Sequence, residues 1–351
     1  MHSALTEKNI ELYDKYVMKT YPKADILFTR GSGCHLWDGD GNEYLDFAAG
    51  IAVCSLGHCH PAVTKAITEQ AQKLVHVSNL FMNERQPELA YKLISHCFDG
   101  VCFFCNSGAE ANEGLIKLAR KWGSTQGRYE IIAMNDSFHG RTLATLAATG
   151  RSKYRKGFEP DTLGFKDILL ILDEIQCGMG RTGTLFAWQG YGVEPDAFSL
   201  AKALGNGYPI AAMVAKRKHE GVLTPGTHAS TFGGTPLASA AACAVVDTLC
   251  NGGVLENCKK QGAFLTGLLK DLMPKHACIK EVRGKGLMVG VVLDYPAVEL
   301  LPILRSKGMI ALTAGETVLR LVPPLIVTED DCRKAAALID AAISEHDGAA
   351  K

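Results

Sequence analysis

From residue 101 onward the chain alternates short apolar runs with helical patterns, and this alternation constrains its fold more than any other feature. The apolar runs occupy 101–105, 129–134, 168–173, 197–201 and 210–215. Helical patterns cover 109–122 and the alanine-rich stretch 236–250. Continuous apolar strands alternating with helices are typical of a sheet covered on both faces. We therefore predict an α/β fold whose sheet is mostly parallel.

The two ends of the chain have a different character. A helical stripe over 7–20 precedes a strand–turn–strand pattern over 34–47, and after residue 253 the pattern is mixed α+β. Thr328 is followed by three acidic residues, which indicates the start of the last helix. A chain of 351 residues is long enough for a large domain and a smaller companion. We predict a large domain over 51–252 and a small α+β domain built from 1–50 and 253–351.

The composition argues against several classes of protein. The chain has 37 basic and 37 acidic side chains, so it has no basic field with which to bind nucleic acid or an anionic membrane. No apolar run approaches the roughly 18–20 residues that span a bilayer. The first 20 residues lack the apolar core of a signal peptide. We therefore expect a cytoplasmic protein whose partners are small molecules.

Twelve cysteines are scattered along the chain, and most lie among apolar residues, where we expect small core side chains. Cys102 and Cys105 have C-x-x-C spacing, but no second pair completes a zinc site. A Cys/His cluster over 54–60 is more simply explained as a loop before a helix that begins at Pro61. We therefore predict neither a metal site nor a disulfide framework.

Four strand ends carry polar or glycine-rich sequence, and ligands of open parallel sheets bind at the carboxyl ends of strands. The first is 106–112, Asn-Ser-Gly-Ala-Glu-Ala-Asn, which leads directly into a helix. Small residues let the backbone approach an anion, and the first helical turn offers unpaired N–H groups. The stretch indicates a phosphate cradle, with a plain strand-to-helix turn as the alternative.

The other three strand ends supply an aromatic ring and charged groups. In the second, Phe138 could stack on a planar ligand and Arg141 could clamp a carboxylate. The third ends in Asp173 and Glu174, and a carboxylate there is costly unless it meets a donor such as a protonated pyridine nitrogen. The fourth ends in Lys202, and a lysine shielded from water becomes a nucleophilic amine.

The stretch 178–183, Gly-Met-Gly-Arg-Thr-Gly, has the glycine spacing of a dinucleotide site. Such a site needs a strand, the glycines and a helix in immediate succession. Here 173–177 intervene after the apolar run, and 184–188 do not form a convincing helix start. We therefore do not expect an NAD-type site.

Together these motifs resemble class III aminotransferases, pyridoxal-phosphate enzymes of the aspartate-aminotransferase-like fold (PLP fold type I). The resemblance rests on N-S-G-A-E-A-N at 106–112, S-F-H-G-R-T at 137–142, L-D-E-I-Q at 172–176 and Lys202. It extends over nearly the whole chain and is greatest to the members that act on acetylornithine. It implies transamination of N-acetylornithine with 2-oxoglutarate, as in arginine biosynthesis. The alternatives are another ω-amino donor (succinylornithine, ornithine or 4-aminobutyrate) or a shortened, non-catalytic homologue.

The resemblance also implies a role for each site residue. Lys202 would bond covalently to pyridoxal 5'-phosphate and then act as acid and base, while Asp173 would keep the ring nitrogen protonated. Thr231 would reach the phosphate held by a neighbouring subunit, so the expected active unit is a homodimer. The remaining implied cofactor contacts are Gln176 to the phenolic oxygen, Phe138 stacked on the ring, and Ser107, Gly108 and Ala109 around the phosphate.

Two arginines fit the need to bind two substrates in turn. By resemblance, Arg320 holds the α-carboxylate of glutamate. Arg141 takes the distal carboxylate of glutamate or the carboxylate of acetylornithine. A hydrogen bond to a charged group contributes about 1.5–3 kcal/mol, so either arginine should matter to the half-reaction that uses it.

The chain departs from the family pattern just before the strand that ends at Asp173. Family members have roughly one and a half βα units more there, ~45 residues, whereas only 161–167 lie between the flanking motifs here. By resemblance, one absent strand lies between the strand before Phe138 and the strand ending at Asp173. Neighbouring strands lie about 4.8 Å apart. Either the sheet closes and Phe138 and Arg141 shift, or strand edges stay unpaired.

Overall fold

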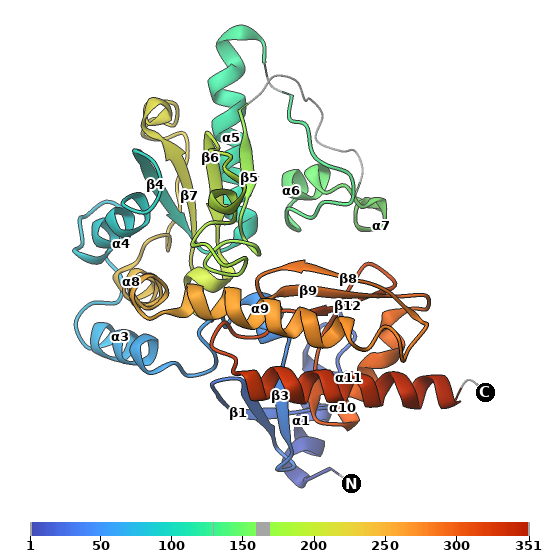
Figure 1. Ribbon diagram of the computed structural model, residues 1–351. Helices are drawn as coiled ribbons and strands as arrows, with labels where there is room; N and C mark the ends of the chain where they lie inside the picture. Colours follow the sequence, from blue (N-terminus) through green and yellow to red (C-terminus); the bar gives the residue numbers. More distant parts are fainter. Residues whose placement is uncertain (1, 129, 159–168, 350–351) are drawn as a thin grey trace. The chain divides into compact units, whose positions relative to one another are not determined.

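The computed structural model describes residues 2–128, 130–158 and 169–349. The chain divides into two compact units, whose elements are labelled in Figure 1. We call Ala52–Ser55 with Pro61–Glu256 the central unit. Met1–Ile51, Leu56–His60 and Asn257–Lys351 form the terminal unit, which is therefore built from both ends of the chain.

The central unit contains a four-stranded sheet in the order β4-β7-β6-β5. Strand β7 is antiparallel to both β4 and β6, whereas β5 is parallel to β6. Three of these four strands therefore run in the same direction, and β7 alone is reversed. The strand bounds are β4 Gly100–Cys105, β5 Ile171–Asp173, β6 Ala197–Leu200 and β7 Ala211–Lys216.

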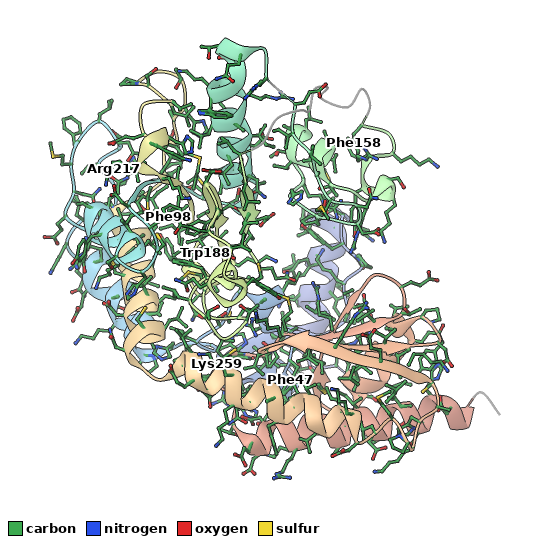
Figure 2. The ribbon with its side chains drawn as sticks, turned by 45° about the horizontal axis from the view of Figure 1, so that its top comes forward. Phe47, Phe98, Phe158, Trp188, Arg217 and Lys259 are labelled. Carbon is green, nitrogen blue, oxygen red and sulfur yellow. The ribbon has the colours of Figure 1, made fainter. Side chains whose placement is uncertain are left out.

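Helices and aromatic side chains bury this sheet. Leu115 and Leu118 of helix α5 (Gly108–Gly123) pack against Met213 of β7, in a cluster that also includes alanines of β6 and β7. A second cluster places Phe98 and Trp188 beside Phe198 of β6 (Figure 2). Helix α8 (Pro236–Asn251) packs against α3 (Pro61–Ala71) and α4 (Arg85–Ile94). Burial of this apolar surface is the main force that fixes the strand ends.

The predicted strand over 129–134 is wrong for the part that the structure describes, 130–134, which forms no strand. Residue 129 lies outside the described residues. The side chains of Ile132 and Met134 are 72% and 77% exposed, so this apolar run covers no core. An apolar run needs a neighbouring strand for its N–H and C=O groups, and β5 is the last strand of the described sheet. Among the described residues, no strand therefore pairs with the outer edge of β5.

Short helices and 3-10 turns connect the elements of the central unit. The connecting elements are α6 Leu143–Ala148, α7 Ser152–Arg155, η1 Ser124–Gln126, η2 Ala187–Tyr191, η3 Lys202–Leu204 and η4 Arg217–His219.

Residue 168, the start of the predicted run 168–173, and the short segment 161–167 lie outside the described residues.

The terminal unit contains two sheets, in the orders β1-β2-β3-β10 and β11-β12-β9-β8. The parallel pair β3–β10 joins residues from the two ends of the chain. The first sheet comprises β1 Phe28–Ser32, β2 His35–Asp38, β3 Glu43–Asp46 and β10 Met309–Ile310. The second comprises β8 Ile279–Lys285, β9 Met288–Leu293, β11 Leu312–Ala314 and β12 Val318–Leu321.

Helices of the terminal unit follow the sequence signals closely. The predicted helix over 7–20 forms as α1, Ala4–Tyr16, with Ser3 as its N-cap. At the last helix, α11 (Glu329–Ala349), Thr328 Oγ1 accepts from the Asp331 amide at 3.2 Å, and Asp331 accepts from the Thr328 amide at 2.9 Å. This reciprocal pair is the predicted cap. The other helical elements are α9 Val254–Lys270, η5 Ala297–Glu299 and α10 Leu300–Ser306.

A strained turn, α2 (Ala49–Ala52), follows β3, and all four of its residues have positive φ. Asp46 steadies its start, because one carboxylate oxygen accepts from the amides of Ala48 and Ala49, at 2.9 Å each.

Across the described residues, no single helix has the length and apolarity to span a membrane, and α8 with α9 passes that test only as a bent pair.

Candidate active site

The strand directions bring three of the predicted site segments to one edge of the central sheet. Strands β4, β5 and β6 run the same way, so the residues that follow their carboxyl ends lie at the same edge. Asp173 is the last residue of β5 and pairs with Ser199 of β6. Lys202 therefore lies three residues beyond the partner of Asp173. Ser107 lies two residues beyond the end of β4.

Helix α5 begins at this edge and exposes the N–H groups of its first turn. Ser107 is the N-cap, and its Oγ accepts from the amide of Glu110 at 3.2 Å. The amides of Gly108 and Ala109 have no acceptor among the described residues. A Cβ at Gly108 would come within 2.6 Å of Ile175, two residues after Asp173. Glycine therefore lets the turn after β5 pack against the start of the helix, where the positive end of the helix dipole favours an anion.

The Asp173 carboxylate is held by donors from three places in the chain. Its Oδ2 accepts from Nδ1 of His139 at 2.8 Å and from Nδ2 of Asn112 at 2.9 Å. Its Oδ1 accepts from the backbone amide of Ile175 at 3.1 Å. The side chain is 19% exposed, so part of it remains accessible. A carboxylate has about four lone-pair sites, so this one can accept a further donor from a ligand.

Glu174, the next residue, faces the interior and has a structural task. It is 3% exposed, and its carboxylate accepts from the amides of Ala187 and Trp188 at 2.6 and 2.8 Å. These two donors are at the start of η2, whose N–H groups have no partners within the helix. Burial raises the pKa of the Glu174 carboxyl, although the two N–H bonds favour its charged form. Of the two adjacent acids, Asp173 is therefore the site residue, and Glu174 caps the start of η2.

Lys202 occupies a strained position directly after β6. Its φ is +46°, a left-handed conformation that residues other than glycine rarely adopt. Such a conformation costs on the order of 1–3 kcal/mol and persists only where the surrounding structure enforces it. Here the neighbours Ala201, Ala203 and Leu204 are buried, and Lys202 itself is half-buried. The strand end thus presents an amine in a fixed, partly shielded setting.

Phe138 and Arg141 lie in a loop that the sequence analysis placed after a strand. Phe138 is 49% exposed and meets Tyr154 edge-on, with ring centroids 5.8 Å apart. The guanidinium of Arg141 lies 4.1 Å from the Tyr154 centroid and 5.4 Å from that of Phe138. Arg141 has no carboxylate partner among the described residues. Cation–π contacts therefore hold this arginine, while its N–H groups can still bind an anion.

The remaining predicted residues occupy three separate places. Gln176 is half-buried in the turn after β5. Thr231 is exposed and lines a pocket of about 360 Å³ together with Asn106 and His228. Arg320 lies on β12 in the terminal unit, where it pairs with Gly290 and Leu312 across the sheet. The central unit therefore gathers most of the predicted set around one sheet edge, and Arg320 belongs to the other unit.

Sequence reasoning missed three residues of this arrangement: Asn112, His139 and Tyr154. Asn112 and His139 lie inside quoted motifs, but nothing in the sequence tells that both turn toward Asp173. The helical spacing of Asn112 from Ala109 would have placed it on the cradle side of α5. Tyr154 lies in α7, and its contact with Arg141 depends on tertiary packing alone.

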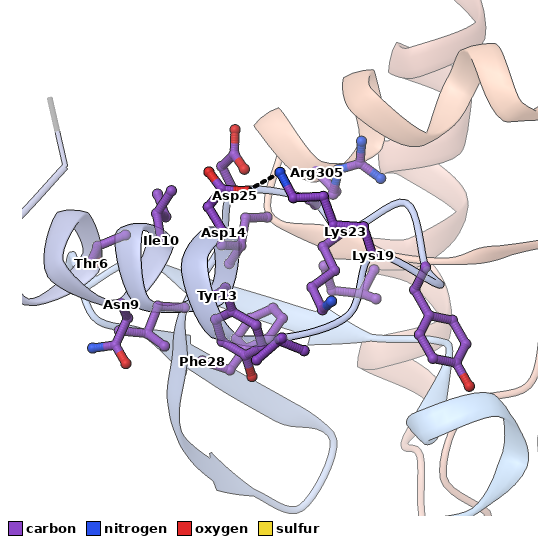
Figure 3. Close-up of a pocket in the computed structure, with 16 residues that line it drawn as sticks. Thr6, Asn9, Ile10, Tyr13, Asp14, Lys19, Lys23, Asp25, Phe28 and Arg305 are labelled. Carbon is purple, nitrogen blue, oxygen red and sulfur yellow. Dashed lines mark ion pairs between the residues drawn. The ribbon is translucent and has the colours of Figure 1, made fainter.

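The terminal unit has a larger open pocket, about 670 Å³, which contains none of the predicted site residues (Figure 3). It lies between α1 and the segment before β1, and Arg305 of α10 contributes to its wall. An ion pair between Asp14 and Lys19 crosses part of it at 2.7 Å. We assign it no role in the chemistry.

The groups at the sheet edge match what pyridoxal phosphate requires. The free amides of Gly108 and Ala109 suit its phosphate, and the accessible part of the Asp173 carboxylate suits a protonated ring nitrogen. Lys202 supplies an amine, and Phe138 a half-exposed aromatic ring. No group of three or more His, Cys, Asp or Glu side chains that could hold a metal ion occurs among the described residues. All twelve cysteines are free thiols.

Comparison with known proteins defines the class to which this arrangement belongs. The family model "Aminotransferase class-III" matches residues 16–166 and 164–343, so the chain belongs to the class III aminotransferases. These enzymes depend on pyridoxal phosphate, which confirms the predicted cofactor and family.

Individual relatives cover nearly the whole chain. An acetylornithine aminotransferase from Caldanaerobacter subterraneus is 45% identical to it, over 94% of this chain and 98% of the relative. In fold the chain is similar to an ornithine aminotransferase from Toxoplasma gondii (TM-score 0.92, 29% identity, 97% of this chain and 94% of that one). It is also similar to an N-acetylornithine aminotransferase from Stenotrophomonas maltophilia (TM-score 0.81, 36% identity, 97% and 100%). These neighbours confirm the predicted aspartate-aminotransferase-like fold.

The same comparisons bear on the short segment before β5. The family model matches in two pieces that meet at 164–166. The alignment with the Caldanaerobacter relative spans 385 positions, but 94% of this 351-residue chain is only about 330 residues. The difference, about 55 positions of the alignment, has no counterpart in this chain.

Proposed function

We propose that this protein transfers the δ-amino group of N-acetylornithine to 2-oxoglutarate, giving N-acetylglutamate 5-semialdehyde and glutamate, a step of arginine biosynthesis. The observation that carries the proposal of transamination is the group at one sheet edge: the Asp173 carboxylate, the Lys202 amine and the free amides at the start of α5. The proposed donor rests on the relatives named acetylornithine aminotransferase, at 39–45% identity over most of the chain.

Pyridoxal phosphate, when bound, supplies an electron-accepting ring that acidifies the C–H bond beside the transferred nitrogen. The chain's own residues do the rest in this proposal. Lys202 would hold the cofactor through its amine and, with an amino substrate bound, would remove and return the proton at the reacting carbon as base and acid. Asp173 accepts a hydrogen bond from the protonated ring nitrogen, and its three donors keep the carboxylate oriented for that bond.

The other predicted residues complete this proposal. The amides of Gly108 and Ala109, with Ser107, hold the phosphate. Phe138 stacks on the ring, and Gln176 hydrogen-bonds the phenolic oxygen. Arg141 binds the carboxylate of N-acetylornithine or the distal carboxylate of glutamate, and Arg320 binds the α-carboxylate of glutamate. We further propose a homodimer in which Thr231 reaches the phosphate of the partner subunit, and a cytoplasmic location.

A second candidate donor is ornithine. The observation that favours it is the high structural similarity to the Toxoplasma ornithine aminotransferase, although its identity is lower than that of the acetylornithine relatives. Succinylornithine and 4-aminobutyrate present the same kind of distal amine. The third possibility is a shortened homologue that binds the cofactor but does not turn over, because the sheet lacks a strand beyond β5 among the described residues.

A substrate panel tests the proposal. The purified protein, loaded with pyridoxal phosphate, is given N-acetylornithine, succinylornithine, ornithine or 4-aminobutyrate with 2-oxoglutarate, and glutamate is measured. The proposal predicts the highest kcat/KM for N-acetylornithine. A preference for ornithine would move the protein to the second candidate, and no glutamate from any donor would support the non-catalytic alternative.

A further inference from the structure

The loop that carries Phe138 and Arg141 is held by a helix, because no strand pairs with it. The residues before the loop, 130–134, form no strand, and β5 ends the described part of the sheet. Besides its contacts with the segment that follows it, which include Thr149 and Tyr154, the loop contacts one face of α5. Ala109, Asn112 and Glu113 are spaced by three and four positions, so they lie on the same side of that helix.

Each of these three residues holds a different part of the loop. Gly140 has φ +144°, and a Cβ there would come within 3.0 Å of the Ala109 Cβ and closer still to Thr145. Thr142 donates from Oγ1 to the carboxylate of Glu113 at 2.5 Å. Between them, Asn112 donates from Nδ2 to the backbone carbonyl of His139 at 2.8 Å.

Asn112 differs from the other two because it also bonds to the site carboxylate. Its Nδ2 carries two N–H donors, and the second reaches Oδ2 of Asp173 at 2.9 Å. Both partners are acceptors, so the orientation of the amide is fixed by chemistry. The side chain is 7% exposed, which shields both bonds from competing water. One amide therefore ties the loop and the end of β5 to the same point on α5.

We propose that Asn112 is a positioning residue that keeps the Phe138–Arg141 loop in register with the Asp173 carboxylate, a register that no strand pairing between them enforces. The inference rests on the proposed function in that it assigns these two segments to one site. Without the Asn112 amide, the loop still contacts Asp173 through His139, α5 through Ala109 and Glu113, and the following segment through Thr149 and Tyr154, but it loses the amide that is bonded to both the loop and Asp173. A displacement of ~1 Å between groups that act on one ligand can cost about a hundredfold in rate.

The first experiment uses the protein without cofactor and needs no activity. Hydrogen–deuterium exchange, read by mass spectrometry, is compared between wild type, Asn112→Ala and Asn112→Asp. The Asp variant keeps the size of the side chain but loses both donors and adds a charge beside Asp173, whereas the Ala variant loses both donors without adding a charge, so an effect shared by the two variants reports the lost hydrogen bonds. We expect roughly tenfold faster exchange in peptides that cover 136–142 in both variants, and unchanged exchange in peptides of β4 and β7.

A matched control distinguishes this from a general loss of stability. Asn257 makes the same kind of clamp in the terminal unit, donating from Nδ2 to the carbonyls of Leu325 and Val327 at 2.7 and 3.1 Å. Asn257→Ala should lower the melting temperature by a similar amount. It should leave exchange over 136–142 and the affinity for pyridoxal phosphate unchanged.

The second experiment measures the site itself. Titration with pyridoxal phosphate should show about tenfold weaker binding for Asn112→Ala and Asn112→Asp, and kcat should fall more than KM rises, about a hundredfold in all. Unchanged exchange over 136–142 in both variants would overturn the proposal, as would wild-type behaviour of Asn112→Asp. If wild type neither binds the cofactor nor turns over, the proposed function fails, while the exchange result still decides the role of Asn112.

Discussion

Nδ1 of His139 donates to Oδ2 of Asp173 at 2.8 Å, and this bond joins a loop that follows no strand to the end of the edge strand β5. Because a carboxylate can only accept, Nδ1 must carry the proton, which fixes the imidazole tautomer. Asn112 reinforces the same oxygen from a third segment. The site is thus organised around one carboxylate, which donors from three segments surround.

Asp173→Asn should abolish most of the activity without unfolding the protein. The amide has nearly the same shape, but its NH₂ group cannot accept from His139, and the side chain no longer carries the charge that favours a protonated ring nitrogen. We expect at least about a hundredfold loss in the first half-reaction, measured by stopped-flow absorption after mixing with N-acetylornithine. A loss below threefold would show that Asp173 is not the partner of the ring nitrogen.

Gly108→Ala should weaken cofactor binding through a steric effect. The new Cβ would lie 2.6 Å from Cδ1 of Ile175 and 3.1 Å from two further atoms of that side chain, so Ile175 must shift away from the start of α5. We expect about tenfold weaker affinity for pyridoxal phosphate, measured by titration of the visible band. Gly221→Ala is the control, because a Cβ there meets nothing within 4 Å. Equal affinities in the two variants would contradict the cradle.

Glu174→Gln should change the pH dependence of stability. Burial raises the pKa of this carboxyl above its ordinary value of 4.5, so the folded protein binds that proton more tightly than the unfolded chain does. The contribution of Glu174 is therefore most favourable below pH 4.5, and it is lost as the pH rises through the folded pKa.

Urea unfolding of wild type and Glu174→Gln across this pH range tests that sign. The wild-type free energy of unfolding should fall with rising pH relative to the variant, which has no proton to lose. Parallel curves for the two proteins would show that Glu174 does not titrate in this range.

Arg320→Ala and Arg141→Ala should affect the two half-reactions differently. Arg320 is proposed to bind only glutamate, so its loss should lower kcat/KM for glutamate at least about tenfold and spare N-acetylornithine. Arg141→Ala should impair both. Each half-reaction is followed separately from the spectrum of the bound cofactor. An Arg320→Ala variant that keeps the wild-type glutamate half-reaction would remove Arg320 from the proposal.

Local sequence signals predicted the ends of elements well. The small residues of 106–112 correctly indicated a helix start, expected at residue 109 and found at Gly108, and Thr328 with Asp331 correctly indicated the cap of α11. These features depend on residues within one turn of each other. The apolar run ending at Asp173 also correctly indicated a strand end at the site edge, because burial of such a run is the default.

Features that depend on distant segments could not be predicted in the same way. Residues 131–134 are all apolar, yet they form no strand, since a strand needs a neighbour that the local pattern does not reveal. Likewise, no spacing tells that Asn112 and His139 both reach Asp173, or that Tyr154 supports Arg141. The short segment before β5 predicted either a shift of the Phe138–Arg141 loop or unpaired strand edges. The contacts by which α5 holds that loop could be seen only in the structure.

The most direct test of a working site in this chain is the visible spectrum of the purified protein with added pyridoxal phosphate, followed by N-acetylornithine and then 2-oxoglutarate. Intact mass confirms that the protein measured is the 351-residue chain. We expect a band of lysine-bound cofactor that bleaches with the amine, returns with the keto acid, and is missing in Lys202→Ala. No band, or a band that Lys202→Ala leaves unchanged, would contradict the assignment of this sheet edge as the active site.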